Sequence, residues 1–519
     1  MCCFTRIIRL FAVLSLGLYL MPASAEQKPL NIVFICAEDM GREFAAYGDR
    51  TLETPGLDRL SAEGIVFDKA YASSPTCSSS RAGMLTGFYT HQHGQYGLVG
   101  RGHSIHEGIP NVVDQLRSAG YFAGVTYKVH IDPDPEFDIG PKNIFGPGKN
   151  AFSNPDRLAA AAELCIKEAQ KSDKPLFLLL NTFDTHALDK KKAYEINNMW
   201  RDQYQGHPAE TLKPGEAPLW NVFRDGEATL AMKEHAAAYY NSLKRVDMTV
   251  EKTLTLLDKY GMNENTLVIF SSDHGPAYPR GKQTLYESGI HVPFIVRWPD
   301  GRNAGERSQA LISLIDLTPT FLEAANLEIP DYLPSKSIMG LGANPQAPFR
   351  KTVGADFFSH WAPEGFHPSY MITDGTYKLI YNPDVWGHRG LTEYGKLQFP
   401  QDMLQQEGIG GEVVRRYLKP PEYELYHIER DAFETVNLAD SIEHKAVLES
   451  FQARLENWRK KNEDPFADHQ LLTDFANEHQ QETRRIKKLT NAKSKDKEAL
   501  KPQIKLGRRK FVSGKFESL

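Results

Sequence analysis

The chain is poor in cysteine for its length. It has five cysteines among 519 residues, and two of them, Cys2 and Cys3, lie at the N-terminus. The other three, Cys36, Cys77 and Cys165, are far apart and cannot form the dense disulfide framework of small secreted domains. Stability must therefore come from a hydrophobic core, which a hydrophobic content of 41% can supply.

Long hydrophobic runs are also scarce. The apolar stretch Leu10–Leu20 follows Arg6 and Arg9 and precedes Ala23-Ser24-Ala25, a small-residue cleavage site. This pattern predicts a signal peptide over residues 1–25. The stretch is shorter than the roughly 20 residues that span a bilayer. We therefore expect an exported protein, periplasmic or extracellular, with no integral membrane segment in the mature chain.

An overall excess of positive charge is absent as well, with 61 Lys and Arg against 66 Asp and Glu. We therefore expect no nucleic acid partner. Positive charge gathers only in residues 484–519, with thirteen Lys or Arg against three Asp or Glu. Two interpretations of this basic tail remain open: a solvated, partly disordered segment, or a contact surface for a polyanion such as a sulfated glycan or an anionic membrane.

Short apolar runs alternate with amphipathic segments along the rest of the chain. Expected strands are Leu30–Cys36, Leu176–Leu180, Leu267–Ser271 and Phe294–Trp298, and expected helices are Asn111–Ser118, Asp156–Lys171 and Glu227–Tyr260. Strands separated by helices predict an α/β fold with a mostly parallel sheet covered on both faces. Active sites of such sheets lie in the loops that follow the strands.

The composition changes near residues 328–350, which are rich in Pro, Gly and Ser. We therefore expect a catalytic domain over residues 26–345 and a smaller C-terminal subdomain over residues 346–483, ahead of the basic tail. In the smaller region we expect a strand at Thr376–Asn382 and a closing helix near His444–Asn462. We find no internal repeats.

The most informative stretch runs from Thr76 to Gly87 and reads TCSSSRAGMLTG. The thiol of Cys77 is followed four residues later by Arg81, at the predicted start of a helix with serine caps. A helix N-terminus supplies free N–H groups and positive partial charge, so it can hold both a nucleophile and an anion. A buried structural cysteine is the alternative interpretation.

This stretch resembles the signature of type I sulfatases, Cys-x-Pro-Ser-Arg-x-x-x-Leu/Met-Thr-Gly, whose cysteine is oxidised to Cα-formylglycine. Ser79 stands where the family has proline. The resemblance implies an alkaline-phosphatase-like sandwich, with a large mixed, mostly parallel sheet between helices and a smaller C-terminal α+β subdomain. It also implies that Cys77 needs a partner, a formylglycine-generating or other sulfatase-maturing enzyme.

Carboxylates follow two of the predicted strands. Glu38-Asp39 ends the first, and Asp273-His274 ends another. Adjacent carboxylates beside a buried strand are costly unless they bind a cation or pair with bases, although Glu38-Asp39 alone could be a helix-capping turn. Oxygen donors suit calcium, or magnesium. Sulfatases usually have Asp-Asp at the first position, and the resemblance implies a metal site of Glu38, Asp39, Cys77, Asp273 and His274.

Basic residues follow further strand ends. Lys128-Val129-His130 resembles the family's Gly-Lys-x-His, Asp184-Thr185-His186 resembles its Asp-Pro/Thr-His, and Lys282 follows the second carboxylate site. Each of these alone is more often a surface residue. Together they imply the catalytic set Cys77, Arg81, Lys128, His130, His186 and Lys282. In it Arg81, Lys128 and Lys282 would hold the sulfuryl oxygens, His186 would protonate the leaving group and His130 would accept a proton.

Two runs, His91–Leu98 and Tyr278–Gly281, resemble the heparan N-sulfatase (sulfamidase) subgroup. The implied function is hydrolysis of sulfate esters or sulfamates on a sulfated polysaccharide or glycosaminoglycan. Two alternatives stay open at this point. One is a phosphate or phosphonate ester hydrolase of the same superfamily. The other is a catalytically silent glycan-binding protein in which Ser79 prevents maturation of Cys77.

Overall fold

The computed structural model describes the chain from residue 28 onward, with gaps. The described residues are 28–140, 153–186, 205–219, 230–278, 280–360, 366–383, 409–492 and 503–518. The expected signal peptide lies outside them. Among the helices of these segments, none has both the length and the apolar character needed to cross a membrane.

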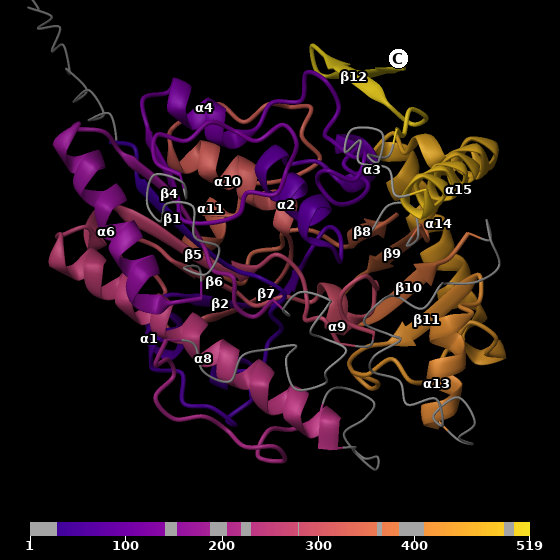
Figure 1. The fold of residues 1–519 in the computed structure, drawn as a ribbon, viewed down its shortest axis with the longest axis horizontal. Helices are drawn as coiled ribbons and strands as arrows, with labels where there is room; N and C mark the ends of the chain where they lie inside the picture. Colours follow the sequence, from indigo (N-terminus) through magenta and orange to yellow (C-terminus); the bar gives the residue numbers. More distant parts are fainter. Residues whose placement is uncertain are drawn as a thin grey trace, which may run out of the picture.

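A seven-stranded sheet forms the centre of the larger domain (Figure 1). Its strands are β1 (Asn31–Ala37), β2 (Ile65–Tyr71), β3 (Phe122–Val125), β4 (Leu176–Asn181), β5 (Thr266–Ser272), β6 (Phe294–Arg297) and β7 (Arg307–Ser313). Their order is β3-β4-β1-β5-β6-β2-β7, and only β6 runs antiparallel to its neighbours. Strands β4 and β5 are buried along their whole length, as expected for a parallel sheet covered on both faces.

Helices cover both faces of this sheet. One face carries α1 (Pro55–Glu63), α6 (Pro155–Lys171) and α8 (Leu230–Lys259), and the other carries α2 (Cys77–Thr86), α4 (Val112–Ser118) and α10 (Leu317–Ala324). The domain also contains the short helices α3 (Thr90–His93), α9 (Glu287–Ile290) and α11 (Met339–Ala343). Alternate residues of β1 face the two cores: Val33 and Ile35 pack toward α8, Ile32 and Phe34 toward α10. The predicted sandwich with a mixed, mostly parallel sheet is confirmed.

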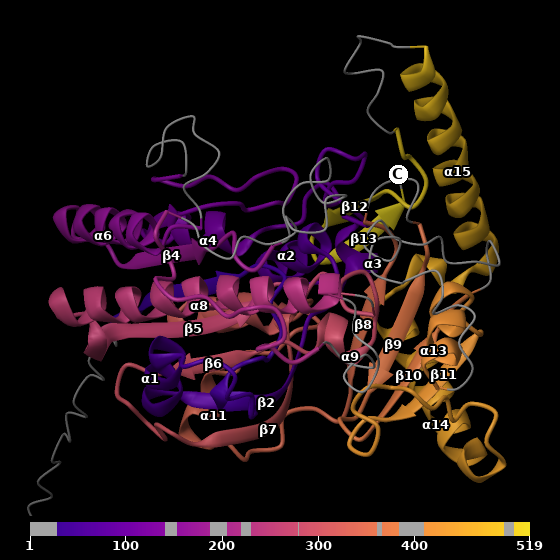
Figure 2. The ribbon, with the colours of Figure 1, turned by 60° about the horizontal axis from the view of Figure 1, so that its bottom comes forward.

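A smaller α+β subdomain packs beside the large sheet (Figure 2). Its strands are β8 (Val353–Phe357), β9 (Ser369–Thr373), β10 (Tyr377–Tyr381) and β11 (Tyr423–His427), and its helices are α13 (Ile409–Leu418), α14 (Lys445–Lys461) and α15 (His469–Asn491). The strands are antiparallel in the order β11-β10-β9-β8. The helix expected near His444–Asn462 is α14, but α15 follows it, so α14 does not close the fold.

The described parts of the basic tail are folded, in contrast to the interpretation of a partly disordered segment. Residues 484–491 continue helix α15, and residues 503–518 contain the hairpin of β12 (Arg509–Val512) and β13 (Lys515–Ser518). Phe511 of this hairpin packs edge-on against Phe88, and Arg508 donates to the carbonyl of Ser104 at 2.7 Å. Much of the positive charge therefore belongs to a segment that packs on the larger domain.

Buried histidines gather where this C-terminal segment meets the larger domain. His103 stacks on His479 of α15, with ring centroids 5.3 Å apart, and His106 Nδ1 accepts the backbone N–H of Arg509. Burial lowers the pKa of His479 to about 4 and that of His103 well below its ordinary value. These rings are therefore neutral in the folded protein, and the contact depends on their staying neutral.

We expect the free energy of unfolding to fall on acidification below pH 6.5. In this range the histidines of the unfolded chain bind protons, whereas the buried imidazoles of the folded chain stay neutral. Each such histidine contributes a slope of about 1.4 kcal/mol per pH unit between its unfolded and folded pKa values, and none above the unfolded value. His479→Phe keeps a ring in place and should flatten the slope between pH 6 and 4.5 by about this amount. Urea titrations at several pH values measure it, with His469→Phe, at the exposed start of α15, as control. An unchanged slope in His479→Phe would contradict the expectation.

Candidate active site

The carboxylates predicted at two strand ends meet at one edge of the sheet. Strands β1 and β5 are parallel neighbours whose last residues, Ala37 and Ser272, lie opposite each other. The chain then turns so that the Asp39 N–H donates to Asp273 Oδ1 at 3.0 Å. Both carboxylates are fully buried. Ions in such a position need compensating charge.

Cys77 is the first residue of α2, so its side chain lies at the positive end of that helix. Its Sγ lies 3.3 Å from Lys282 Nζ, 3.3 Å from His274 Nε2 and 3.8 Å from Asp39 Oδ1. Burial raises the pKa of the Cys77 thiol, against the lowering effect of Lys282. The sulfur is therefore a neutral group at the centre of a charged cluster.

Arg81 lies one helical turn after Cys77 and faces the same cluster. Its Nε donates to Asp273 Oδ2 at 2.9 Å, and one terminal nitrogen donates to Asn181 Oδ1 at 3.1 Å. Burial would raise the pKa of Asp273, but His274 and Arg81 hold it below its usual range. Asn181 in turn donates to the Lys128 carbonyl at 2.7 Å. The sequence analysis missed Asn181, although a polar last residue in an otherwise apolar strand was its signal.

Two lysines neutralise the carboxylates after β1. Lys282 is fully buried, and its Nζ donates to both oxygens of Asp39, at 2.7 and 2.9 Å. Lys128 forms an ion pair with Glu38. Burial lowers the pKa of Lys128 to about 7. Both predicted lysines therefore converge on the predicted carboxylates.

The donor atoms at this edge fit a divalent cation. The ligand atoms of Asp39, Cys77, Asp273 and His274 lie within 4.8 Å of one another, and those of Glu38, Asp39, Cys77 and His186 form a second such group. In the buried Glu38 carboxylate, Oε1 pairs with Lys128, and Oε2 has no hydrogen-bond partner among the described residues, which leaves Oε2 open toward a cation. Three carboxylates in one buried cluster suit a hard ion such as calcium.

The two predicted histidines are both half-buried. The His186 side chain is 23% exposed, and its Nε2 lies 3.9 Å from Asp39 Oδ2. Burial together with Lys128, Arg81 and His360 lowers the pKa of His130 well below its ordinary value. His360 comes from the loop after β8 in the smaller subdomain. Sequence reasoning missed it, since no pattern connects it to the strand ends of the larger domain.

Several residues at this edge have positive φ values, which residues other than glycine usually avoid. Asp39, His130, Arg280 and Gln283 have φ values of 56°, 66°, 63° and 70°. Left-handed conformations of residues other than glycine cost roughly 1–3 kcal/mol and gather at functional sites. Two of these residues flank Lys282 closely, so its position is set by a strained turn.

A buried ion pair holds the segment that carries His186. Arg245 of α8 donates to both oxygens of Asp184, at 2.9 and 2.8 Å. The Asp184 carbonyl accepts the Glu38 N–H at 3.2 Å, which ties this segment to the end of β1. Asp184 is thus occupied by Arg245, and Arg245 is a supporting residue that its helical pattern alone did not reveal.

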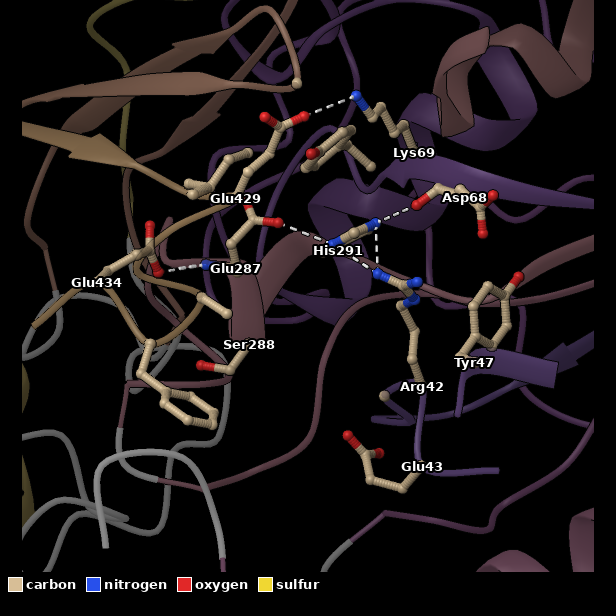
Figure 3. Close-up of a pocket in the computed structure, with 16 residues that line it drawn as sticks. Arg42, Glu43, Tyr47, Asp68, Lys69, Glu287, Ser288, His291, Glu429 and Glu434 are labelled. Atoms are coloured by element: carbon tan, nitrogen blue, oxygen red, sulfur yellow. Dashed lines mark hydrogen bonds and ion pairs between the residues drawn. The ribbon is translucent and has the colours of Figure 1, made fainter. Parts of the chain in front are cut away.

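A cavity of about 420 Å³ lies at the seam between the large sheet and the smaller subdomain (Figure 3). Arg42 and His291 contact each other at 2.8 Å across it, and Glu287 pairs with His291 at 2.7 Å. Glu434 of the smaller subdomain accepts the Glu287 N–H at 2.7 Å. None of the residues predicted to be catalytic lines this cavity. It belongs to the contact between the subdomains.

A mostly parallel sheet between helices, with carboxylates and cationic side chains gathered at its strand ends, defines a hydrolase of the alkaline-phosphatase-like fold. The sequence profile of the Sulfatase family matches residues 30–327. The chain belongs to the sulfatase family and is a sulfuric ester hydrolase. A second profile, described as N-sulphoglucosamine sulphohydrolase, C-terminal, matches residues 279–395.

Individual relatives agree with this assignment. The chain is 28% identical over 498 residues to human N-sulphoglucosamine sulphohydrolase, covering 87% of this chain and 94% of the relative. It is 26% identical over 469 residues to an ulvan-active sulfatase of Formosa agariphila, covering 82% and 74%. A structure solved with its substrate D-glucosamine-2-N,6-O-disulfate superposes with a TM-score of 0.62 at 19% identity, covering 84% and 99%. The resemblance to sulfatases, including the sulfamidase subgroup, is confirmed.

Proposed function

We propose that the chain is an exported sulfatase that hydrolyses sulfamates or sulfate esters on a sulfated glycan. N-sulfated glucosamine is the first substrate class to test. Two findings support this choice. The named relative that aligns over 94% of its own length is a sulfamidase, and the profile of that enzyme's C-terminal region matches this chain. The relative named as an ulvan-active sulfatase extends the proposal to sulfated polysaccharides such as ulvan.

The observation that carries the proposal is the position of Cys77. Its Sγ lies within 3.3 Å of both Lys282 and His274, at a helix N-terminus that can hold an anion. Formylglycine made from Cys77 would supply a nucleophilic hydroxyl from its hydrated aldehyde. Glu38, Asp39, Asp273 and His274 would hold a calcium or magnesium ion, which supplies Lewis acidity toward the nucleophile and the sulfuryl oxygens.

The remaining residues bind the anion and move protons. Arg81, Lys128 and Lys282 carry the positive charge that would hold the sulfuryl oxygens and stabilise the charge that develops in the transition state. His186, whose side chain is 23% exposed, would protonate the leaving nitrogen or oxygen as it departs toward solvent. His130, whose lowered pKa favours the neutral imidazole, would accept a proton from the nucleophilic group.

Mass spectrometry of the tryptic peptide Ala70–Arg81 tests the proposal, using protein made in a host with a sulfatase-maturing enzyme. Conversion of Cys77 to formylglycine should lower the peptide mass by about 18 Da. The matured protein should then release sulfate from N-sulfated glucosamine faster than it cleaves an aryl phosphate. An unmodified thiol would favour the silent glycan-binding alternative, and faster phosphate or phosphonate cleavage would favour the other hydrolase.

A further inference from the structure

Gln95 links the helix of Cys77 to the segment of His130. Its side chain is fully buried. The side-chain amide nitrogen donates to the His130 carbonyl at 3.2 Å, and the side-chain oxygen accepts the Asp132 N–H at 3.0 Å. One amide group therefore holds the backbone on both sides of Ile131. No sequence motif assigned a role to this residue.

The backbone of Gln95 is anchored to α2 in turn. The Ser79 hydroxyl donates to the Gln95 carbonyl at 2.7 Å. The Gln95 N–H donates to His93 Nδ1 at 3.1 Å, and His93 Nε2 lies 3.0 Å from the Ser79 carbonyl. Since Nδ1 accepts, Nε2 must carry the proton and donate to Ser79. Burial lowers the pKa of His93 to about 4, which keeps this neutral tautomer in place.

Ser79 departs from the sulfatase signature. It lies two residues after Cys77, where the sulfatase signature has proline, and proline has no hydroxyl to donate. The bond from Ser79 to Gln95 exists because of this departure. Ser79 is itself almost completely buried, so water could not replace the Gln95 carbonyl as the partner of its hydroxyl.

The backbone of the His130 segment is strained and depends on its surroundings to keep its conformation. His130 has a φ of 66°, a conformation that costs roughly 1–3 kcal/mol and persists only when the surroundings fix it. Loss of the Gln95 amide would leave the His130 carbonyl and the Asp132 N–H without this partner. The backbone could then relax toward an ordinary conformation and carry the imidazole away from the site.

We propose that Gln95 is a positioning residue for His130, and that Ser79 couples it to the helix that carries Cys77. The inference rests on the proposed function, because His130 acts as a proton acceptor only there. Gln95 would not touch substrate. It would fix the distance between the modified cysteine and the histidine through two hydrogen bonds to the His130 segment and one from Ser79.

Gln95→Met tests the inference, because methionine preserves the length of the side chain and removes both hydrogen bonds. We expect kcat to fall about 10- to 100-fold with KM changed less than about threefold, since a small misplacement of a catalytic group affects chemistry more than binding. Gln92→Met is the matched control. Gln92 is a buried glutamine whose side chain accepts the Tyr89 N–H at 3.2 Å, and among the described residues it has no hydrogen bond to the His130 segment. Its kcat should stay within about twofold of wild type.

Hydrogen exchange supplies a readout that does not depend on turnover. The Asp132 amide should exchange at least tenfold faster in Gln95→Met than in wild type, and at the wild-type rate in Gln92→Met. Ser79→Ala, a milder change, should give a smaller drop in kcat in the same direction. Unchanged exchange of the Asp132 amide in Gln95→Met would show that Gln95 does not hold the His130 segment. Fast exchange with unchanged kcat would overturn the positioning role of Gln95. A wild-type protein with protected Asp132 but no sulfatase activity would overturn the proposed function alone.

Discussion

Replacement of Cys77 by alanine is expected to abolish turnover, with kcat lowered by at least about 10³-fold, while the fold is retained. The sulfur lies at the meeting point of Lys282, His274 and Asp39, and no other nucleophilic side chain among the described residues lies at this position. The cationic side chains around it can bind an anion and the carboxylates can hold a cation, but none of these groups replaces the nucleophile. The measurement is sulfate release under saturating substrate.

The stability of the same variant separates chemistry from folding. Removing one sulfur atom at a polar site should change the free energy of unfolding by about 1 kcal/mol or less. Cys165→Ala is the matched control, because Cys165 is equally buried but lies in α6. Its sulfur packs closely against Gly124 of β3, away from the predicted catalytic residues. It should keep full activity. Turnover by Cys77→Ala within tenfold of wild type would contradict the assignment of Cys77.

The central strands of the fold could be predicted from the sequence, because uninterrupted apolar runs occur only where both sheet faces are covered. Strand β2 shows the limit of that rule. Its sequence, IVFDKAY, is interrupted by Asp68 and Lys69. Asp68 pairs with Arg307 of the neighbouring strand, and Lys69 lies 3.7 Å from Glu429 of the smaller subdomain. These charges are compensated by residues hundreds of positions away, so no local pattern could reveal the strand.

The same distinction applies to the site. Glu38-Asp39 and Asp273-His274 could be predicted to meet, because neighbouring parallel strands end at the same edge of a sheet. His360 and Arg245 reach the site from the smaller subdomain and from the middle of a long helix. Their roles depend on how elements pack, which residue spacing does not contain. In the basic tail, charge suggested solvation, but apolar residues of the tail such as Ile504 and Phe511 are buried in hydrophobic clusters.

Lys282→Met is expected to lower kcat by about 10²- to 10³-fold, the effect typical of removing one fixed donor to a developing charge. Lys282 Nζ lies 3.3 Å from Cys77 Sγ, so its charge would act on oxygens bound at that position. KM should change less than kcat, because the charge on these oxygens grows as the transition state forms. Steady-state kinetics on the matured protein measures both constants.

The lysine also pairs with Asp39, so a loss of activity could arise from a disturbed carboxylate instead of a lost donor. Removing a positive charge beside Asp39 should strengthen cation binding, because one competing partner of that carboxylate disappears. Calorimetry with calcium separates the two causes: tighter binding with lower kcat identifies a lost donor, and weaker binding identifies a collapsed site. Lys69→Met, a control at a lysine that pairs with Glu429 away from the site, should change neither quantity. Wild-type kcat in Lys282→Met would show that Arg81 and Lys128 suffice to hold the anion.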